Sequence, residues 1–189
     1  MNGERIGGVL LAAGAATRFG ADKLAADLGG ETLLHRAAAA MLGAGLDPVI
    51  VVVAPGTDRP VPDRVTTVVN DNARDGMATS VRAGLAALRG EPDVAAAVIA
   101  PADQPWCGTA VYSRLVDAYL RSGRPVIVAT VDGAPRNPVL LARAQWRLSE
   151  RIDGDVGLSA VVRTLSPLPV ECADVGSIAD VDTPADLVP

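Results

Sequence analysis

The sequence predicts an α/β protein in which a mostly parallel central sheet is flanked by helices. Short, β-branched apolar runs alternate with longer stretches of helical periodicity, and this order is typical of right-handed βαβ units. The runs are apolar throughout, so we expect strands that are buried on both faces of the sheet. The chain has 189 residues, of which 49% are hydrophobic, and we expect a single domain spanning 1–189 with a substantial core.

The first half of the chain alternates expected strands with expected helices. The apolar segments "IGGVLLAA", "PVIVVVA", "VTTVV" and "VAAAVIA" predict strands at 6–13, 48–54, 65–69 and 94–100. Helices are predicted at 31–45 and 76–90. In the second of them, four apolar residues from Met77 to Leu88 recur at helical spacing along one face.

The second half begins with a predicted helix at 108–123 and a strand at 125–130. Gly133, Pro135 and Pro138 then interrupt an apolar segment, which predicts a hairpin-like excursion over 131–141. Two short helices at 142–151 and 156–164 and a last strand at 168–173 are expected to follow. Thr183 and Pro184 suit the N-cap and the first position of a closing helical turn.

Composition and charge argue against several classes of protein. The formal charge is −5, aromatic residues make up 3% and no basic stripe is present, so a nucleic-acid partner is not expected. Cys107 and Cys172 lack the spacing of a zinc site and are expected to be reduced, as in a cytoplasmic protein. The N-terminal apolar run is only as long as a strand, so we expect neither a signal peptide nor a membrane span.

The first strand runs into a segment rich in small residues, "LAAGAATRFGADK" at 11–23. Five residues separate Gly14 from Gly20 and two separate Gly20 from Lys23, which matches neither a Walker A loop nor a dinucleotide fingerprint. Small side chains still let backbone N–H groups approach phosphate oxygens. Arg18 offers a bidentate fork, and Lys23, the only lysine of the chain, offers a compact charge. The segment therefore predicts a triphosphate site, with a solvated surface charge as the alternative for Lys23.

This segment resembles the L-A-A/G-G-x-x-x-R-M/F-G-x-x-K signature of nucleotidyltransferases with a Rossmann-like fold. Among them the chain is similar to the MobA-like family, and most similar to the molybdenum cofactor cytidylyltransferases of the MocA type. The resemblance implies a nucleotide-diphospho-sugar transferase fold and transfer of a nucleoside monophosphate from a nucleoside triphosphate. It implies CTP as the donor, because Ala13 gives the form "LAAG" rather than "LAGG". The residues that it assigns to the nucleotide are Leu11, Ala12, Ala13, Gly14, Arg18 and Lys23, with Arg18 and Lys23 also catalytic.

A second part of the resemblance is "NDNARDGMATSVRAGL", which is similar to the family's N-x5-G-M-x-x-S-[LV] segment. It implies that a loop and a helix N-terminus hold the base and the ribose. N–H groups at Gly76 and Met77 could read the edge of a base, and Asn70 or Ser80 could hydrogen-bond the nucleoside. The alternative is an ordinary helix start with Asp75 as the N-cap and Met77 in the core.

Two carboxylates are the predicted metal ligands. Asp103, in "VIAPADQPW", follows an expected buried strand, and α/β folds place ligand chemistry at that end of a strand. Mg²⁺ needs one or two carboxylates together with phosphate oxygens. "DQP" resembles a family motif, which implies that Asp103 is a catalytic, nucleotide-binding and metal-binding residue. "DVDTPADL" resembles another, which implies that Asp182 is the second metal ligand. Asp180 lies on the same side of the extended chain as Asp182. The alternatives are a turn residue for Asp103 and a plain helix start after Asp182.

The acceptor is predicted from less complete matches. "GAPRNPVLL" and "LSERIDGDVGLSAVV" resemble family segments that face the phosphate acceptor, and the candidate contacts are Gln104, Arg136 and Asp155. The first segment lacks the family's Gly-His pair and the second lacks its Ala-Arg pair. A surface arginine and a turn residue are the alternatives for Arg136 and Asp155.

Together these residues predict in-line attack of an acceptor phosphate on the α-phosphorus of the nucleotide, with release of pyrophosphate. A phosphate monoester has a second pKa of about 6, so no general base is required. His35 is then expected to be a packing or surface residue. The expected partners are a nucleoside triphosphate, molybdopterin and a recipient molybdoenzyme or its chaperone. The alternatives are a guanylyltransferase of the same cofactor, a nucleotidyltransferase for a sugar phosphate or another small phosphate, and a non-catalytic nucleotide-binding protein that inserts the cofactor.

Overall fold

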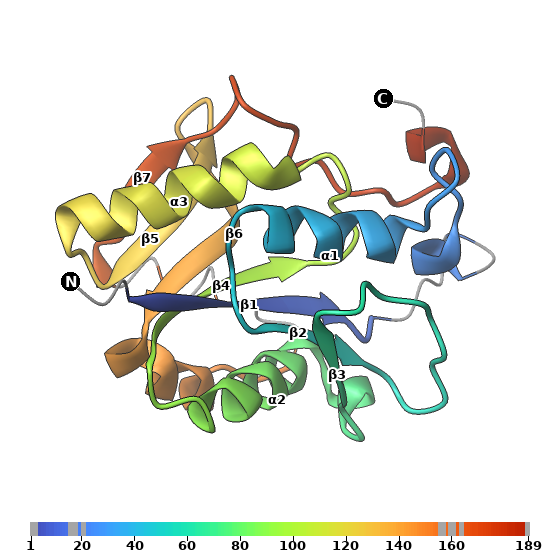
Figure 1. The fold of residues 1–189 in the computed structure, drawn as a ribbon, viewed down its shortest axis with the longest axis horizontal. Coiled ribbons are helices and arrows are strands. Elements are labelled where there is room, and N and C mark those ends of the chain that lie inside the picture. Colours follow the sequence, from blue (N-terminus) through green and yellow to red (C-terminus); the bar gives the residue numbers. More distant parts are fainter. Residues whose placement is uncertain are drawn as a thin grey trace.

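The structure is a computed structural model that describes residues 4–14, 19, 22–154, 158, 162 and 165–187. Within them, seven strands form one sheet in the order β3-β2-β1-β4-β6-β5-β7, and β6 alone runs antiparallel to its neighbours (Figure 1). The predicted mostly parallel sheet is confirmed. The strand bounds are Arg5–Ala12 (β1), Val49–Val53 (β2), Val65–Val69 (β3), Val94–Pro101 (β4), Val126–Val131 (β5), Ala134–Ala142 (β6) and Leu168–Glu171 (β7).

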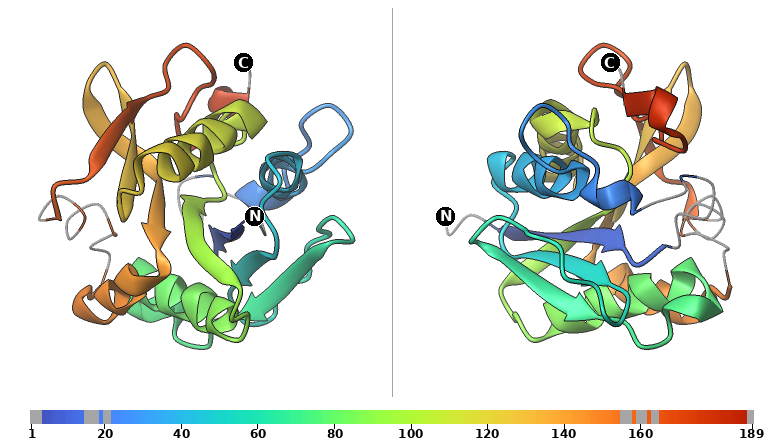
Figure 2. Two further views of the ribbon diagram at one scale, coloured as in Figure 1. Left: turned by 60° about the vertical axis from the view of Figure 1, so that its left-hand side comes forward. Right: turned by 90° about the vertical axis from the view of Figure 1, so that its right-hand side faces the viewer.

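Helices cover both faces of this sheet. α1 (Leu33–Gly43) and α3 (Gly108–Ser122) lie on one face, whereas α2 (Met77–Arg89) and the 3₁₀ helix η3 (Arg143–Arg151) lie on the other (Figures 1 and 2). The part of the chain that the structure describes contains no helix long and apolar enough to cross a membrane. Shorter 3₁₀ helices lie at Lys23–Ala25 (η1), Ala73–Asp75 (η2) and Pro184–Leu187 (η5).

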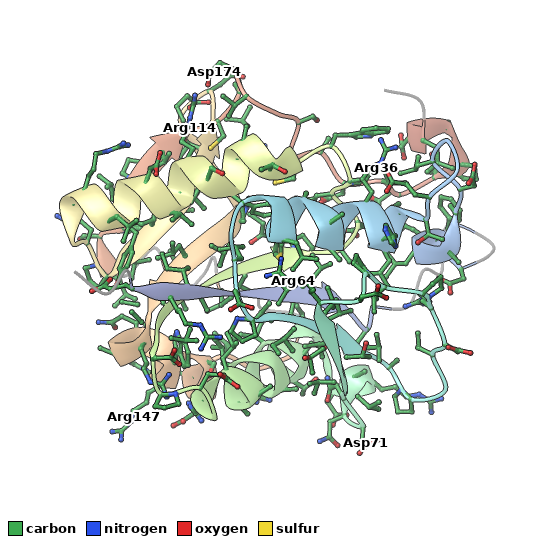
Figure 3. The ribbon with its side chains drawn as sticks, in the orientation of Figure 1. Arg36, Arg64, Asp71, Arg114, Arg147 and Asp174 are labelled. Atoms are coloured by element: carbon green, nitrogen blue, oxygen red, sulfur yellow. The ribbon has the colours of Figure 1, made fainter. Side chains whose placement is uncertain are left out.

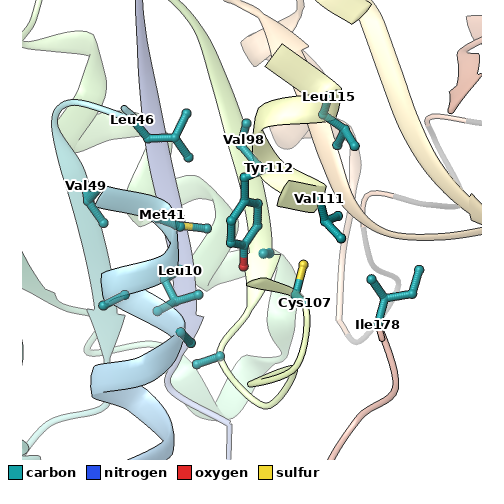
Figure 4. Close-up of a cluster of buried hydrophobic side chains, with 14 of the residues drawn as sticks. Leu10, Met41, Leu46, Val49, Val98, Cys107, Val111, Tyr112, Leu115 and Ile178 are labelled. Carbon is teal, nitrogen blue, oxygen red and sulfur yellow. The ribbon is translucent and has the colours of Figure 1, made fainter. Parts of the chain in front are cut away.

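Large apolar side chains fill the core between the sheet and the layer of α1 and α3. Tyr112 is fully buried there beside Met41 and Cys107 (Figure 4). Burial raises the pKa of the Cys107 thiol to about 12, so this side chain stays neutral and packs as an apolar group. Cys107 and Cys172 are both buried and free, which agrees with the reduced cysteines expected from the sequence.

One expectation about these elements is wrong and another is confirmed. The sequence predicts that β3 is buried on both faces, but Thr66, Thr67 and Val69 are exposed because β3 forms an edge of the sheet. The closing helical turn begins at Pro184 as predicted, directly after Thr183, whose N–H and hydroxyl donate to Asp186 Oδ2 at 2.8 Å and 2.9 Å.

The second half of the chain otherwise follows the predicted order. The hairpin expected at 131–141 is confirmed, since β5 and β6 pair in antiparallel fashion around a turn at Asp132 and Gly133, whose φ angles are 52° and 75°. The helix expected at 142–151 is present as η3, in 3₁₀ form. The helix expected at 156–164 lies almost entirely outside the described residues.

The carboxyl ends of β1, β2 and β4 lie level with one another. Leu11 of β1 pairs with Val52 of β2 and with Pro101 of β4. The chain passes from β1 to β2 and β3 on one side and then returns to place β4 on the other side of β1. Open α/β sheets bind ligands at such a switch point, because the connections diverge there and leave a crevice. The loops that follow these strands are therefore positioned to form a site.

Candidate functional site

A cleft of about 660 Å³ opens at this edge of the sheet and is called the first cleft below. Its walls come from the segments that follow β1, β2, β3 and β4, four elements that are adjacent in the sheet. It brings together eight of the residues predicted to bind a nucleotide: Leu11, Ala13, Gly14, Lys23, Gly76, Met77, Ser80 and Asp103.

The other predicted nucleotide residues lie elsewhere. Arg18 falls outside the described residues. Ala12 is buried at the end of β1. Asn70 is also buried, and its amide Nδ2 donates to Ser80 Oγ at 3.0 Å and to Thr79 Oγ1 at 2.8 Å. Asn70 therefore connects the loop after β3 to the first turn of α2, and the structure does not place it among the residues that line the cleft.

Gly76 allows two backbone segments to meet beside the first cleft. Its φ is 106°, and a Cβ at this position would lie 2.2 Å from the carbonyl carbon of Gly154. Two residues further along the chain, the Ala78 N–H donates to the Gly154 carbonyl at 3.1 Å. The structure contradicts the alternative of Asp75 as the N-cap, since Gly76 occupies the cap position and no side chain caps the helix there.

Replacing Gly76 by alanine is expected to destabilise the fold and to weaken nucleotide binding. The new Cβ would meet Gly154 backbone, and the positive φ would be strained, at a cost of about 1–3 kcal/mol. Chemical denaturation and nucleotide titration would measure the two effects. Gly133→Ala, at a positive-φ position with open space around it, is the control for strain alone, and equal nucleotide affinity in both variants would contradict the expected role of Gly76.

Lys23 joins the two predicted metal-ligating carboxylates. Its Nζ lies 2.8 Å from Asp103 Oδ2 and 3.6 Å from Asp182 Oδ1, and its side chain is only 12% exposed. The backbone holds the same arrangement, because the Val181 N–H donates to the Asp103 carbonyl at 2.8 Å. Residues that are far apart in the sequence thus meet around one ammonium group.

The arrangement fits a hard cation that also binds phosphate. Asp103 Oδ1 is buried and has no hydrogen-bond partner among the described residues. In that part of the chain no group of three or more His, Cys, Asp or Glu side chains could hold a metal alone. A pair of carboxylates completed by substrate oxygens is the ligand set that Mg²⁺ prefers. Asp103 and Asp182 are the residues that could hold it.

A second cleft, of about 820 Å³, lies beyond Gln104. Gln104 is buried, and its Nε2 donates to Asp180 Oδ1 at 2.9 Å. Burial raises the pKa of Asp180, the bond from Gln104 lowers it, and the charges of Asp103 and Asp182 raise it further, so the net direction is upward. Arg136 also lines this cleft, whereas Asp155 lies outside the described residues.

The rim of the second cleft is supported by an ion pair. Asp174 lines this cleft, and Arg114 of α3 donates from Nη2 to Asp174 Oδ2 at 3.0 Å (Figure 3).

Two adjacent residues of one turn line different clefts, Asp103 the first and Gln104 the second. This turn therefore borders both clefts.

Sequence reasoning missed three charged residues of the first cleft, Asp22, Arg59 and Arg74. Arg59 lies in "APGTDRPVPDR", which follows the expected strand at 48–54. The place of Arg59 after an expected parallel strand could have marked it as a site residue, because segments after such strands line the ligand crevice. No motif singles it out, since glycines, prolines and charges are ordinary in such connections.

The family is established by comparison with known proteins. The profile described as the MobA-like NTP transferase domain matches residues 8–169, which is most of the chain. The chain belongs to the MobA-like NTP transferase family. It is a nucleotidyltransferase, and its single α/β domain has the Rossmann-like fold of that group.

Relatives agree with this assignment. A protein of Mycobacterium tuberculosis named probable molybdenum cofactor guanylyltransferase is 30% identical over 189 residues, which cover 96% of this chain and 91% of that protein. The bifunctional enzyme IspD/IspF of Clavibacter michiganensis is 39% identical over 118 residues, but the match spans 54% of this chain and only 29% of that enzyme.

Solved structures show the same fold. An Rv0371c homologue from Mycobacterium sp. strain JC1 superposes with a TM-score of 0.82 at 25% identity, covering 97% of this chain and 93% of that one. A manganese complex of Rv0371c from M. tuberculosis superposes with a TM-score of 0.72 at 24% identity, covering 88% of this chain and 86% of that one.

Proposed function

We propose that this nucleotidyltransferase transfers a nucleoside monophosphate from a nucleoside triphosphate to the phosphate of molybdopterin and releases pyrophosphate. The observation that carries the proposal is the position of the Asp103–Gln104 turn between two clefts, with Lys23 and Asp182 beside it. The first cleft takes the nucleotide and the second takes the pterin. The name of the M. tuberculosis relative supports the choice of acceptor.

The residues of the chain act by positioning and by charge. The small residues after β1 let backbone N–H groups approach the triphosphate, and the Lys23 ammonium faces its negative charge. Arg136, on the wall of the second cleft, orients the acceptor phosphate. This phosphate is largely dianionic near neutral pH, so it attacks the α-phosphorus without a general base. We assign Arg18 to the triphosphate and Asp155 to the acceptor on the family resemblance.

Asp103 and Asp182 are the proposed ligands of Mg²⁺. When bound, the cation supplies charge neutralisation at the phosphates and makes the α-phosphorus more electrophilic. The orphaned Oδ1 of Asp103 and the oxygen-only donor set support this assignment. The manganese complex of Rv0371c makes Mn²⁺ the second metal to test.

We propose CTP as the donor. Ala13 lines the first cleft, and the form "LAAG" that it gives resembles the cytidylyltransferases, which supports a pyrimidine donor. GTP is the second candidate, because a relative that aligns over 96% of this chain is named a probable molybdenum cofactor guanylyltransferase. The reaction is assigned to the cytoplasm, and its product to a molybdoenzyme or the chaperone of one.

The test is pyrophosphate release by the purified protein with molybdopterin and each of CTP, GTP, UTP and ATP, in Mg²⁺ and in Mn²⁺. We expect release only when nucleotide, acceptor and metal are all present, and fastest with CTP. Fastest release with GTP would overturn the choice of base alone. Nucleotide binding without any release would favour the non-catalytic alternative.

Replacing Ala13 by glycine is expected to shift the donor preference from CTP towards GTP. One methyl group in a binding pocket changes selectivity by about tenfold or more. The measurement is the ratio of kcat/KM for CTP to kcat/KM for GTP in the wild type and in the variant. An unchanged ratio would remove Ala13 from the base-selecting residues.

A further inference from the structure

Arg59 reaches the first cleft from the connection between β2 and β3. Its side chain is only 14% exposed, although it lies in a surface connection that contains three prolines. Its Nε donates to Asp22 Oδ2 at 2.6 Å, and its Nη1 donates to the carbonyl oxygen of Ala12 at 3.1 Å. This partly buried guanidinium group, which has two hydrogen-bond acceptors on other segments, is part of the wall of the cleft.

The two acceptors of Arg59 bracket the proposed triphosphate loop. Ala12 is the last residue of β1, and Asp22 is the residue before η1, so residues 13–21 lie between them. One planar guanidinium thus ties the end of β1 to the residue before η1. A lysine at this position could not do the same, because its single ammonium lacks the fixed fork that spans two acceptors.

Asp22 connects Arg59 to the predicted reaction centre. It is the N-cap of η1, where its Oδ1 accepts from the Leu24 N–H at 3.2 Å. Burial acts to raise the pKa of Asp22, but the bonds from Arg59 and from the amides of η1 lower it below its ordinary value, so the carboxylate stays charged. The next residue is Lys23, whose Nζ lies 2.8 Å from Asp103. Arg59 thus contacts Asp22, Asp22 precedes Lys23 in the chain, and Lys23 contacts Asp103.

We propose that Arg59 is a positioning residue for the nucleoside triphosphate, and that it ties the end of β1 to Asp22 and so holds the neighbouring Lys23 in place. The inference rests on the proposed function, because it takes the first cleft as the nucleotide site. Arg59 lines the first cleft and is not among the residues that line the second, so its influence falls on the donor and not on the acceptor.

The test is a comparison of Arg59→Gln, Arg59→Lys and Arg64→Gln in the full-length protein. Arg64 lies on the same connection and is exposed, so it is the matched control for loss of one positive charge (Figure 3). We expect Arg59→Gln to raise the Kd and the KM for CTP by about tenfold or more. Without Arg59 the ammonium of Lys23 is no longer held in place, and a misplaced binding group weakens binding of the triphosphate. The KM for molybdopterin and the values for Arg64→Gln are expected to stay unchanged. Arg59→Lys keeps the charge and the aliphatic stem, and we expect it to bind CTP more weakly than the wild type as well.

A double-mutant cycle with Asp22→Asn separates positioning from a simple charge effect. We expect Asp22→Asn to weaken CTP binding and the double variant Asp22→Asn/Arg59→Gln to lose less affinity than the two single losses combined, since both remove the same tie. Unchanged CTP binding in Arg59→Gln, or an equal rise in both KM values, would overturn the role of Arg59 while the proposed function stands. A wild-type protein that binds no nucleoside triphosphate would overturn the proposed function and this inference with it.

Discussion

Replacing Asp103 by asparagine is expected to abolish nucleotidyl transfer while the fold stays intact. The substitution keeps the size of the side chain but removes the charge that faces Lys23 and the proposed metal. Loss of one group that stabilises charge in the transition state costs about a hundredfold or more in rate, and Asp103 is a proposed ligand of the cation that does so. Initial rates of pyrophosphate release would measure the loss, and far-UV circular dichroism with thermal melting would check the fold.

Asp71→Asn is the matched control for this experiment. Asp71 is an exposed carboxylate on the neighbouring loop after β3, so it tests whether the loss of any negative charge near the cleft is enough (Figure 3). We expect near-normal rates from this variant. Near-normal rates from Asp103→Asn as well would remove Asp103 from the metal site and from catalysis.

Replacing Lys23 by methionine is expected to have the second largest effect. The side chain would keep its aliphatic length but lose the ammonium that contacts Asp103 and Asp182. Loss of one member of a buried charge pair costs at least about tenfold in affinity where a charged ligand depends on it, so the Kd for CTP should rise by that factor. Isothermal titration with a non-hydrolysable CTP analogue would measure binding without turnover.

Lys23→Arg serves as the companion variant. It restores the charge with a broader, planar group, so we expect partial recovery of CTP binding relative to methionine. If methionine and lysine at position 23 bound CTP equally well, Lys23 would be a surface charge that happens to lie near two carboxylates. In that case the triphosphate would have to be held by other cations of the loop.

The sequence predicts most of this fold because its signals are local. The strand segments are continuous apolar runs, and the hairpin after 125–130 is marked by Gly133 and by prolines that cannot continue a regular helix. The exposure of β3 could not be predicted in the same way. Its sequence, "VTTVV", carries no sign of its place in the strand order, and only the tertiary arrangement puts it at an edge.

The residues of the candidate site also differ in how far their sequence positions predict them. Lys23 and Asp103 stand in motifs of fixed spacing, so the amino-acid sequence alone predicts them as site residues, and the folded chain brings their side chains to within 2.8 Å of each other. Arg59 and Asp22 contact each other across 37 positions of sequence, Arg59 stands in no motif, and the signature at 11–23 leaves position 22 open to any residue. Asn70 shows the opposite case, because its motif is evident but its amide is engaged with Thr79 and Ser80.

The measurement that tests the central claim most directly follows radiolabelled phosphorus from the nucleotide into the products. The wild-type protein would be incubated with molybdopterin, Mg²⁺ and CTP labelled at either the α or the γ position. We expect the α label to appear in a pterin dinucleotide and the γ label to appear in pyrophosphate, in equal amounts. A γ label on the acceptor, or an α label that stays entirely in free nucleotides, would contradict nucleotidyl transfer to molybdopterin at the Asp103 site.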